Sequence, residues 1–247
     1  MRFAFFFVFI VALIPLSGHT ATIRFVAEDL PPYHYLDPTG KPTGALVEVA
    51  RQLLTQTGLK GNIEIMPMAR ALHEMRAKDN TLLLSWLKTP ERAQHYRFLG
   101  VMCHAQAYLI GLKDRTFSLR DLNSARQHRV STIRGYYSER FLRAAGYSED
   151  HELVLVSHYQ TLWHMLFKGR TDLVLTNAQT INKELNALGL PAEQVERKMA
   201  VPAFPSELHL ATSLDFNQQH ADQLMSALAS LKDSGKYQQI LSKWQLN

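Results

Sequence analysis

The chain has 247 residues, of which 46% are hydrophobic and 20% are charged. This balance is typical of globular proteins and excludes a disordered or fibrous protein. Lys and Arg exceed Asp and Glu by 27 − 22 = 5. Cys103 is the single cysteine, which excludes an intramolecular disulfide and a cysteine-based zinc cluster. The length allows one large domain or two modest lobes.

The N-terminus has the pattern of an export signal. Arg2 precedes an uncharged apolar run over residues 3–16, which is short for a membrane span. A basic start, a short apolar core and small polar residues predict a secretory signal peptide over residues 1–21. Cleavage is expected after Ala21 or, alternatively, after Gly18. An uncleaved anchor is the other interpretation of this segment.

An α/β pattern follows the signal. Alternating apolar residues predict a strand over Ile23–Ala27, and apolar residues at helical spacing predict a helix from Ala45 to Gly58. The next predicted elements are a strand around Ile63, a helix opened by Pro67 and a buried strand over Thr81–Leu87. This order predicts a parallel sheet with helices on its faces.

The same pattern starts again near residue 107. The predicted strands are Tyr108–Leu112, Arg129–Ile133, Leu153–Val156 and Leu173–Thr176, and the predicted helices are Tyr137–Ala145, Ser157–Gly169 and Ile181–Leu188. Ser157 and Gln160 fit a capping box at the start of the second of these helices.

A tail of predicted elements comes last. It consists of a strand over Glu207–Ala211, a helix over Asn217–Leu231 with Met225 on its inward face, and a short helix over Tyr237–Trp244. This tail is too short to form its own core, so we expect it to pack on one of the two lobes.

Charged, aromatic and amide side chains follow the predicted strands, at the strand ends where open parallel sheets bind ligands. They are Glu28, Asp29 and Tyr33, the segment Thr89–Arg92, Arg134, Gly135, Tyr136 and Tyr137, and finally Asn177. Such groups can hold a small polar molecule between two lobes. The tyrosines either stack on that molecule or pack within the protein, and Gly135 fits a turn.

Thr89, Pro90 and Glu91 predict a helix start, with Thr89 as the N-cap residue. Arg92 then lies beside free backbone N–H groups, an arrangement that suits a carboxylate. The alternative is a surface arginine that pairs with Glu91 or Glu48.

Residues 112–147 contain eight Lys or Arg and three acidic residues, a local charge of 8 − 3 = +5. This segment either favours an anionic ligand or partner or is a solvated basic surface. The chain contains no nucleic-acid-binding motif, phosphate loop or metal-ligand spacing. We therefore expect no nucleic-acid partner, no metal and no cofactor.

Five segments occur in a characteristic order: AEDLPPYHYLDPTGKPTGALVEVARQL, PMARALHEMRA, SWLKTPERAQHYRF, STIRGYYSERFL and GKYQQILSKW. Together they resemble the bacterial periplasmic solute-binding proteins of the polar amino-acid transport family. The resemblance implies a periplasmic location and a two-lobed α/β periplasmic-binding-protein fold of type II. It implies hinge crossings near His104–Ala107 and Pro202–Ser206, with lobe 1 over 22–104 plus 206–247 and lobe 2 over 107–203.

The resemblance also implies roles for residues of the first lobe. Arg92 corresponds to the arginine that binds a ligand carboxylate, and Ser85 corresponds to a hydroxyl donor next to Trp86. Tyr33 and Met68 fall near positions that sandwich the ligand side chain. A further residue, Arg70, either faces the cleft or pairs with Glu74.

In the second lobe, Tyr137 falls near a position that helps to hold the carboxylate, and its neighbours Gly135 and Tyr136 are also predicted ligand-binding residues. Asn177 stands where the family usually has an aspartate that pairs with the ligand ammonium. An amide cannot neutralise a buried ammonium. We therefore expect a ligand other than a simple α-amino acid, unless Glu28 or Asp29 supplies the charge. Arg134 and the basic segment favour a neutral or anionic ligand.

The resemblance thus predicts a monomeric, non-enzymatic binding protein that closes around a small, amino-acid-like carboxylate and delivers it to an inner-membrane ABC permease. One alternative is an exported dehydratase or lyase on the same fold, with Glu28 as its general acid or base. The other alternative is a ligand-sensing subunit.

Overall fold

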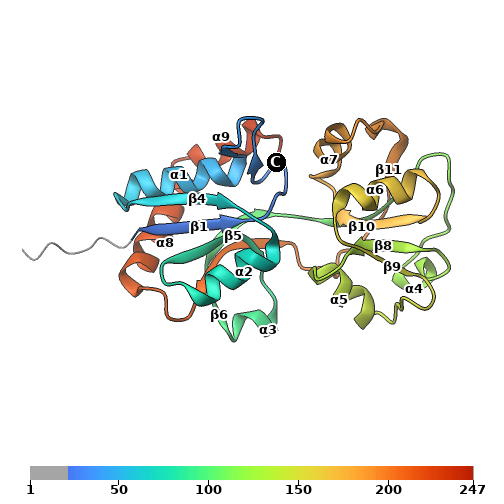
Figure 1. Cartoon of the computed structure of the whole chain (residues 1–247), viewed down its shortest axis with the longest axis horizontal. Coiled ribbons are helices and arrows are strands. Elements are labelled where there is room, and N and C mark those ends of the chain that lie inside the picture. Colours follow the sequence, from blue (N-terminus) through green and yellow to red (C-terminus); the bar gives the residue numbers. More distant parts are fainter. Residues whose placement is uncertain (1–21, 247) are drawn as a thin grey trace, which may run out of the picture.

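The computed structural model describes residues 22–246, which form two α/β lobes (Figure 1). The predicted signal peptide lies outside the described residues. The sheet of lobe 1 has the spatial order β4-β1-β5-β12-β6. Its strands are β1 (Ile23–Ala27), β4 (Gly61–Ile65), β5 (Thr81–Leu87), β6 (Tyr96–His104) and β12 (Glu207–Ser213). As predicted, β1 is parallel to β4 and β5, whereas β12 is antiparallel to both of its neighbours.

Helices cover both faces of this sheet. On one face α1 (Ala45–Thr57) contacts α8 (Gln218–Asp233) and α9 (Lys236–Lys243), and their apolar residues form one core with Phe25 and Leu84. On the other face α2 (Met68–Ala77) packs over Val26 and Leu83. The remaining elements of lobe 1 are α3 (Pro90–Ala93) and the small hairpin of β2 (Tyr35–Leu36) and β3 (Pro42–Thr43).

The C-terminal tail completes lobe 1, because β12 lies between β5 and β6. Leu224 and Leu228 of α8 are buried in the core of this lobe. Met225 was predicted to face the same core, but its side chain is 44% exposed. That prediction is wrong because the helix turns about 100° between successive residues, which places Met225 outside the narrow buried stripe.

The sheet of lobe 2 has the spatial order β11-β7-β10-β8-β9. Its strands are β7 (Ala107–Leu112), β8 (Val130–Ile133), β9 (Leu153–Val156), β10 (Leu173–Asn177) and β11 (Val195–Ala200). The helices are α4 (Leu122–Ala125), α5 (Tyr137–Ala144), α6 (Tyr159–Phe167) and α7 (Ile181–Ala187), with a 3-10 turn over Ala192–Gln194. β8 is parallel to β9 and β10, and β7 is antiparallel to β10 and β11.

The predicted capping box of Ser157 and Gln160 does not form. The N-cap position of α6 is occupied by His158, whose side chain makes no capping hydrogen bond. The stability of this helix comes from burial instead, since Leu162, Trp163 and Leu166 pack into the core of lobe 2.

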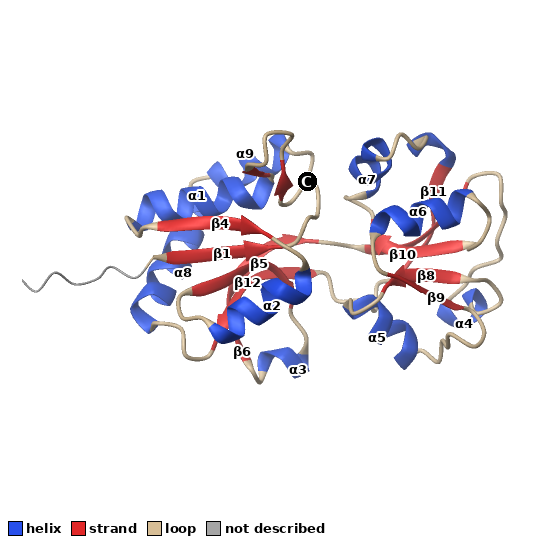
Figure 2. Cartoon of the chain, in the orientation of Figure 1, coloured by secondary structure: helices blue, strands red, loops and turns tan. Residues whose placement is uncertain are grey.

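Two chain crossings join the lobes, one between β6 and β7 and the other between β11 and β12 (Figures 1 and 2). The backbone N–H of Ala105 in the first crossing donates to the carbonyl of Ser206 in the second, at 2.7 Å. This bond ties the crossings together where the lobes meet. Across the described residues, no helix is both long and apolar enough to traverse a bilayer.

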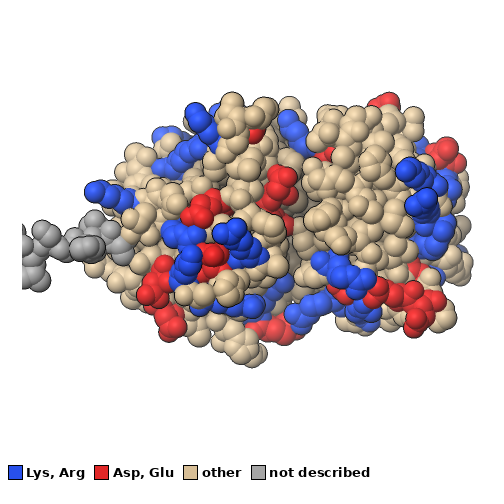
Figure 3. Space-filling model, viewed as in Figure 1, with Lys and Arg blue, Asp and Glu red and all other residues tan. Residues whose placement is uncertain are grey.

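The basic segment of lobe 2 is largely neutralised by ion pairs. Arg115, Arg126 and Arg134 pair with Asp172, Glu152 and Glu149 at 2.8, 2.9 and 2.6 Å, and Arg129 and Arg143 also have acidic partners. Figure 3 shows basic and acidic side chains side by side on this lobe. Most of the basic side chains of this segment are therefore paired with acidic side chains on the surface. Arg134 is one of them, and it is exposed rather than directed at a ligand.

Candidate ligand-binding site

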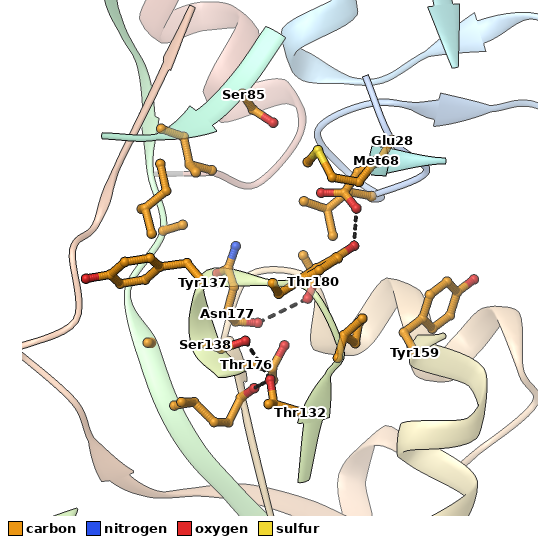
Figure 4. Close-up of a pocket in the computed structure, with 18 of the residues that line it drawn as sticks. Glu28, Met68, Ser85, Thr132, Tyr137, Ser138, Tyr159, Thr176, Asn177 and Thr180 are labelled. Atoms are coloured by element: carbon orange, nitrogen blue, oxygen red, sulfur yellow. Dashed lines mark hydrogen bonds between the residues drawn. The ribbon is translucent and has the colours of Figure 1, made fainter. Parts of the chain in front are cut away.

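A pocket lies between the lobes and is lined by residues of both. In Figure 4, Glu28, Met68 and Ser85 of lobe 1 lie across the pocket from lobe 2 residues that include Asn177 and Thr180. The predicted ligand-binding residues that line it are Glu28, Met68, Ser85, Trp86, Arg92, Gly135, Tyr136, Tyr137 and Asn177.

The other two predicted residues do not line the pocket. Tyr33 lies behind its wall and is fully buried in the core of lobe 1. Arg70 is exposed on α2, and its suggested partner Glu74 is instead held by Arg24 at 3.0 Å and Lys78 at 2.7 Å. Asp29 is also exposed and outside the pocket wall.

Arg92 enters the pocket from the start of α3. As predicted, Thr89 is the N-cap, and its hydroxyl oxygen accepts from the Arg92 N–H at 3.3 Å. The guanidinium donates to the carbonyl of Leu87 at 2.9 Å, and its carbon lies 4.5 Å from the centroid of the Trp86 ring. Stacking on indole holds the guanidinium plane in place.

No carboxylate among residues 22–246 forms a salt bridge with Arg92, and Glu48 pairs with Lys243 instead. Burial, helped by the nearby charge of Arg140, lowers the pKa of Arg92 to about 10. A guanidinium has five N–H donors. Arg92 is therefore a partly desolvated cation with donors to spare, which suits an incoming anion.

Ser85 is bound to a buried histidine. His34 lies with Nδ1 2.7 Å from the carbonyl oxygen of Glu28 and Nε2 2.5 Å from the Ser85 hydroxyl. Burial lowers the pKa of His34 to about 4, so the ring is neutral and carries its proton on Nδ1, facing the carbonyl. Nε2 must then accept from Ser85. The serine consequently offers the pocket acceptor lone pairs, whereas the family resemblance implied a donor.

Glu28 directly follows β1 and is only 7% exposed. One carboxylate oxygen accepts a hydrogen bond from the Tyr136 hydroxyl of lobe 2. The other oxygen, Oε1, has no hydrogen-bond partner among the described residues. Burial raises the pKa of Glu28 to about 7, although the Tyr136 hydrogen bond partly offsets this effect.

A second acidic residue of the pocket, Glu184, was not predicted from the sequence. It lies on α7, is 2% exposed and accepts a hydrogen bond from the Trp163 indole N–H at 2.6 Å. Burial raises the pKa of this carboxyl. A glutamate within a short polar helix usually faces solvent, so the sequence carried no signal for its burial.

Asn177, at the end of β10, already uses both of its polar atoms. Its Nδ2 donates to the Tyr33 hydroxyl of lobe 1 at 2.9 Å, and its Oδ1 accepts from the backbone N–H of Gln179 at 3.0 Å. The amide therefore connects the lobes in addition to lining the pocket.

The loop before α5 supplies the rest of this wall. Gly135 has a φ of +82°, which favours glycine, and its N–H donates to the Glu139 carboxylate at 2.6 Å. Tyr137 packs edge-on against Phe204 of the second crossing, with 5.4 Å between ring centroids. Deeper in lobe 2, the hydroxyls of Thr132 and Ser138 lie 2.6 Å apart (Figure 4). Neither hydroxyl was predicted to belong to the site.

The sequence profile of the bacterial extracellular solute-binding proteins, family 3, matches residues 23–247. No curated protein sequence matches the chain significantly. Among solved structures, a histidine kinase sensor domain with similarity to periplasmic binding proteins has a TM-score of 0.79 at 19% identity, covering 90% of this chain and 95% of its own.

Two further structures share the fold. An ancestral arginine-binding protein bound to arginine has a TM-score of 0.76 at 20% identity and covers 90% of this chain and 97% of its own. A Salmonella typhimurium periplasmic binding protein described for high arginine specificity has a TM-score of 0.72 at 18% identity, with coverages of 90% and 98%. The predicted two-lobed fold is confirmed, and this chain belongs to the bacterial extracellular solute-binding proteins of family 3.

Proposed function

We propose that this protein captures a small carboxylate-bearing, amino-acid-like ligand between its lobes, with Arg92 as the carboxylate anchor. The observation that carries this proposal is the environment of Arg92. Its guanidinium lines the pocket, is held by Leu87 and Trp86, and has no acidic partner among the described residues. A positioned, partly desolvated guanidinium gains a charge-assisted, bidentate partner when a carboxylate binds.

The pocket is lined by residues of both lobes, an arrangement that allows a ligand to be captured when the lobes close around it. Lobe 1 contributes Arg92 and Glu28, and lobe 2 contributes Tyr136, Tyr137 and Asn177. A ligand that contacts both sets favours the closed arrangement by the difference in its affinity for the two states. We place the hinge at the crossings near 104–107 and 202–206, between lobe 1 (22–104 plus 206–247) and lobe 2 (107–203).

Binding assays on the purified mature protein test the anchor. Thermal-shift screening of amino acids, organic acids and small peptides identifies a ligand, and calorimetry then measures its affinity. We expect Arg92→Ala to weaken binding at least 100-fold, because a desolvated charge pair loses one partner. Arg92→Lys should restore only part of this loss, since an ammonium cannot replace the planar fork.

Arg70→Ala is the matched control, because Arg70 is an exposed arginine of the same lobe outside the pocket. This variant should bind like the unmodified protein. Equal affinities of Arg92→Ala and the unmodified protein would show that the anchor is assigned to the wrong residue.

The cellular role we propose is delivery of the ligand from the periplasm to an inner-membrane ABC permease by a monomeric carrier. Two structural neighbours that bind arginine, one of them a periplasmic binding protein, support an amino-acid-like ligand and a periplasmic location. Loss of uptake of the identified ligand in a strain lacking the gene, restored by the full chain but not by Arg92→Ala, tests this role.

Sensing is the second candidate role, because a histidine kinase sensor domain shares the fold with a TM-score of 0.79. In that case uptake of the ligand would be unaffected by loss of the gene, and the liganded protein would copurify with a membrane receptor instead of a permease.

A further inference from the structure

Two buried carboxylates face the pocket from opposite lobes. Glu28 and Glu184 both line it, with exposures of 7% and 2%. Their hydrogen-bond donors are neutral groups, the Tyr136 hydroxyl for Glu28 and the Trp163 indole together with the Thr180 hydroxyl for Glu184. Neither carboxylate pairs with a Lys or Arg among residues 22–246, although the surface of both lobes is rich in such pairs.

An ionised carboxylate is costly to bury without a counter-charge. The fold buries two such carboxyl groups in one cavity, where the charge of Glu184 also contributes to the raised pKa of Glu28. Oε1 of Glu28 remains without a hydrogen-bond partner among the described residues and lies on a residue of the pocket wall. Both carboxyl groups thus lie at the pocket wall, where a ligand can reach them, and neither has a cationic partner among the described residues.

This acidic end of the pocket is distinct from the Arg92 end. Glu28 follows β1, whereas the Arg92 guanidinium lies at the end of the neighbouring strand β5, against Leu87 and Trp86. The charge of Arg92 is nevertheless not among those that shift the pKa of Glu28. The charges that act on the Glu28 carboxylate are those of Glu184 and Asp29. A single group cannot satisfy both ends of the pocket.

We propose that Glu28 and Glu184 form a cation-binding site across the cleft, so that the ligand is a carboxylate carrying an ammonium or guanidinium group at its other end. This inference rests on the proposed function and names its ligand class. Because the two carboxylates belong to different lobes, a cation between them also draws the lobes together. This cationic ligand class differs from the neutral or anionic ligand that Arg134 and the basic segment suggested. Arg134 does not support that earlier expectation, because it pairs with Glu149 on the surface.

Asn177 is consistent with this ligand class. Its amide is engaged with Tyr33 and Gln179 and carries no charge, so an α-ammonium next to the carboxylate gains little there. The positive charge that matters is then the one at the far end of the ligand.

Two pairs of probes, matched in shape and differing in charge, test the site by calorimetry on the full mature chain. Arginine is compared with citrulline, whose terminal group is a neutral urea, and 6-aminohexanoate with 6-hydroxyhexanoate. We expect the cationic member to bind at least tenfold more tightly in at least one pair. Glu184→Gln keeps an acceptor for Trp163 and removes the charge, as Glu28→Gln does for Tyr136.

Each variant should weaken the cationic probe about tenfold to 100-fold and leave the neutral probe within threefold, because a charge-assisted hydrogen bond is lost. Glu152→Gln is the control, since Glu152 is an equally buried glutamate of lobe 2 that pairs with Arg126 away from the pocket. It should change neither affinity.

Equal binding of both members in both pairs, no binding of any probe, or equal losses for charged and neutral probes would overturn the cation site. The carboxylate anchor has a separate readout. If Arg92→Ala still weakens a carboxylate found in the wider screen, the proposed function stands while the cation site falls.

Discussion

The side-chain amide of Asn177 in lobe 2 donates a hydrogen bond to the hydroxyl of Tyr33 in lobe 1, with 2.9 Å between Nδ2 and Oη. Tyr33 is fully buried, so this hydrogen bond joins the two lobes at a place that solvent does not reach. A second contact between the lobes, from the Tyr136 hydroxyl to the Glu28 carboxylate, lies within the pocket itself. In the proposed closed arrangement, the lobes therefore contact each other directly in addition to contacting a ligand.

Removing the Tyr33 hydroxyl should weaken closure. We expect Tyr33→Phe to lower ligand affinity about threefold to tenfold, because one hydrogen bond specific to the closed arrangement is lost. Tyr237→Phe is the matched control, since the Tyr237 hydroxyl donates to the Met102 carbonyl within lobe 1 at 2.5 Å. That variant should lose stability without losing affinity. Calorimetry and urea unfolding separate the two effects, and equal affinity losses would contradict the assignment.

Hinge closure should be visible in solution. Saturation with the identified ligand is expected to lower the radius of gyration measured by small-angle scattering, because the lobes rotate about the two crossings. Arg92→Ala provides the control at the same ligand concentration and should remain expanded. An unchanged scattering profile for the saturated, unmodified protein would show that capture does not involve closure.

The strong periodic patterns of the sequence predicted most strands and helices, whereas the edge strands β6 and β11 of the two five-stranded sheets, the short β2–β3 hairpin and helix α4 were missed. β11 (VERKMA) is polar because a strand at an edge needs little apolar surface. In β6 the buried residues Leu99, Met102 and Cys103 do not alternate, because its register with β12 shifts twice. A bulged strand loses the two-residue period that makes strands recognisable.

Within the site, features that depend on neighbouring residues in the sequence could be predicted, whereas pairings between residues far apart in the sequence could not. Thr89 and Pro90 fix the helix start that positions Arg92, and this pattern is readable from four consecutive residues. Glu184 is buried only because Trp163, 21 residues earlier, lies against it. Ser85 offers the pocket only acceptor lone pairs, because its hydroxyl proton is donated to His34, which is 51 residues away in the chain. Such pairings depend on the packing of distant segments.

Neutralising Glu28 should stabilise the protein without ligand. The pKa of this carboxyl rises from 4.5 to about 7 on folding, so between these values the folded state holds a proton that the unfolded chain releases. Stability therefore falls as the pH rises through this window, by up to roughly 3 kcal/mol. Glu28→Gln should be about 1–3 kcal/mol more stable than the unmodified protein at pH 8 and nearly equal to it at pH 4.5.

Urea unfolding at the two pH values measures this difference. Glu152→Gln serves as the control, because the buried Glu152 carboxylate loses its ion pair with the partly exposed Arg126, which should destabilise the protein at pH 8. A Glu28→Gln protein that is less stable than the unmodified one at pH 8 would show that the buried carboxylate has a counter-charge.

Ligand affinity should depend on pH through the same carboxyl. Below about pH 7 Glu28 is protonated in the free protein, so a cationic ligand must displace that proton to form its ion pair. We expect the affinity for a cationic carboxylate to fall as the pH is lowered from 8 to 5.5, by up to about tenfold per pH unit below 7. A neutral isostere should bind equally across this range.

The other titratable groups around Glu28 do not reverse this sign. Burial raises the pKa of Glu184 and of Asp29, so both act in the same direction as Glu28, and His34 stays neutral because burial lowers its pKa to about 4. Burial also raises the pKa of Tyr136, which remains a hydrogen-bond donor throughout. Calorimetry in two buffers of different ionisation enthalpy should detect proton release on binding near pH 6.5. In Glu28→Gln that release should largely disappear and the pH dependence should flatten. Because Glu28→Gln removes only one proton site, an unchanged slope in this variant would assign the pH dependence to Glu184 and contradict the role given to Glu28.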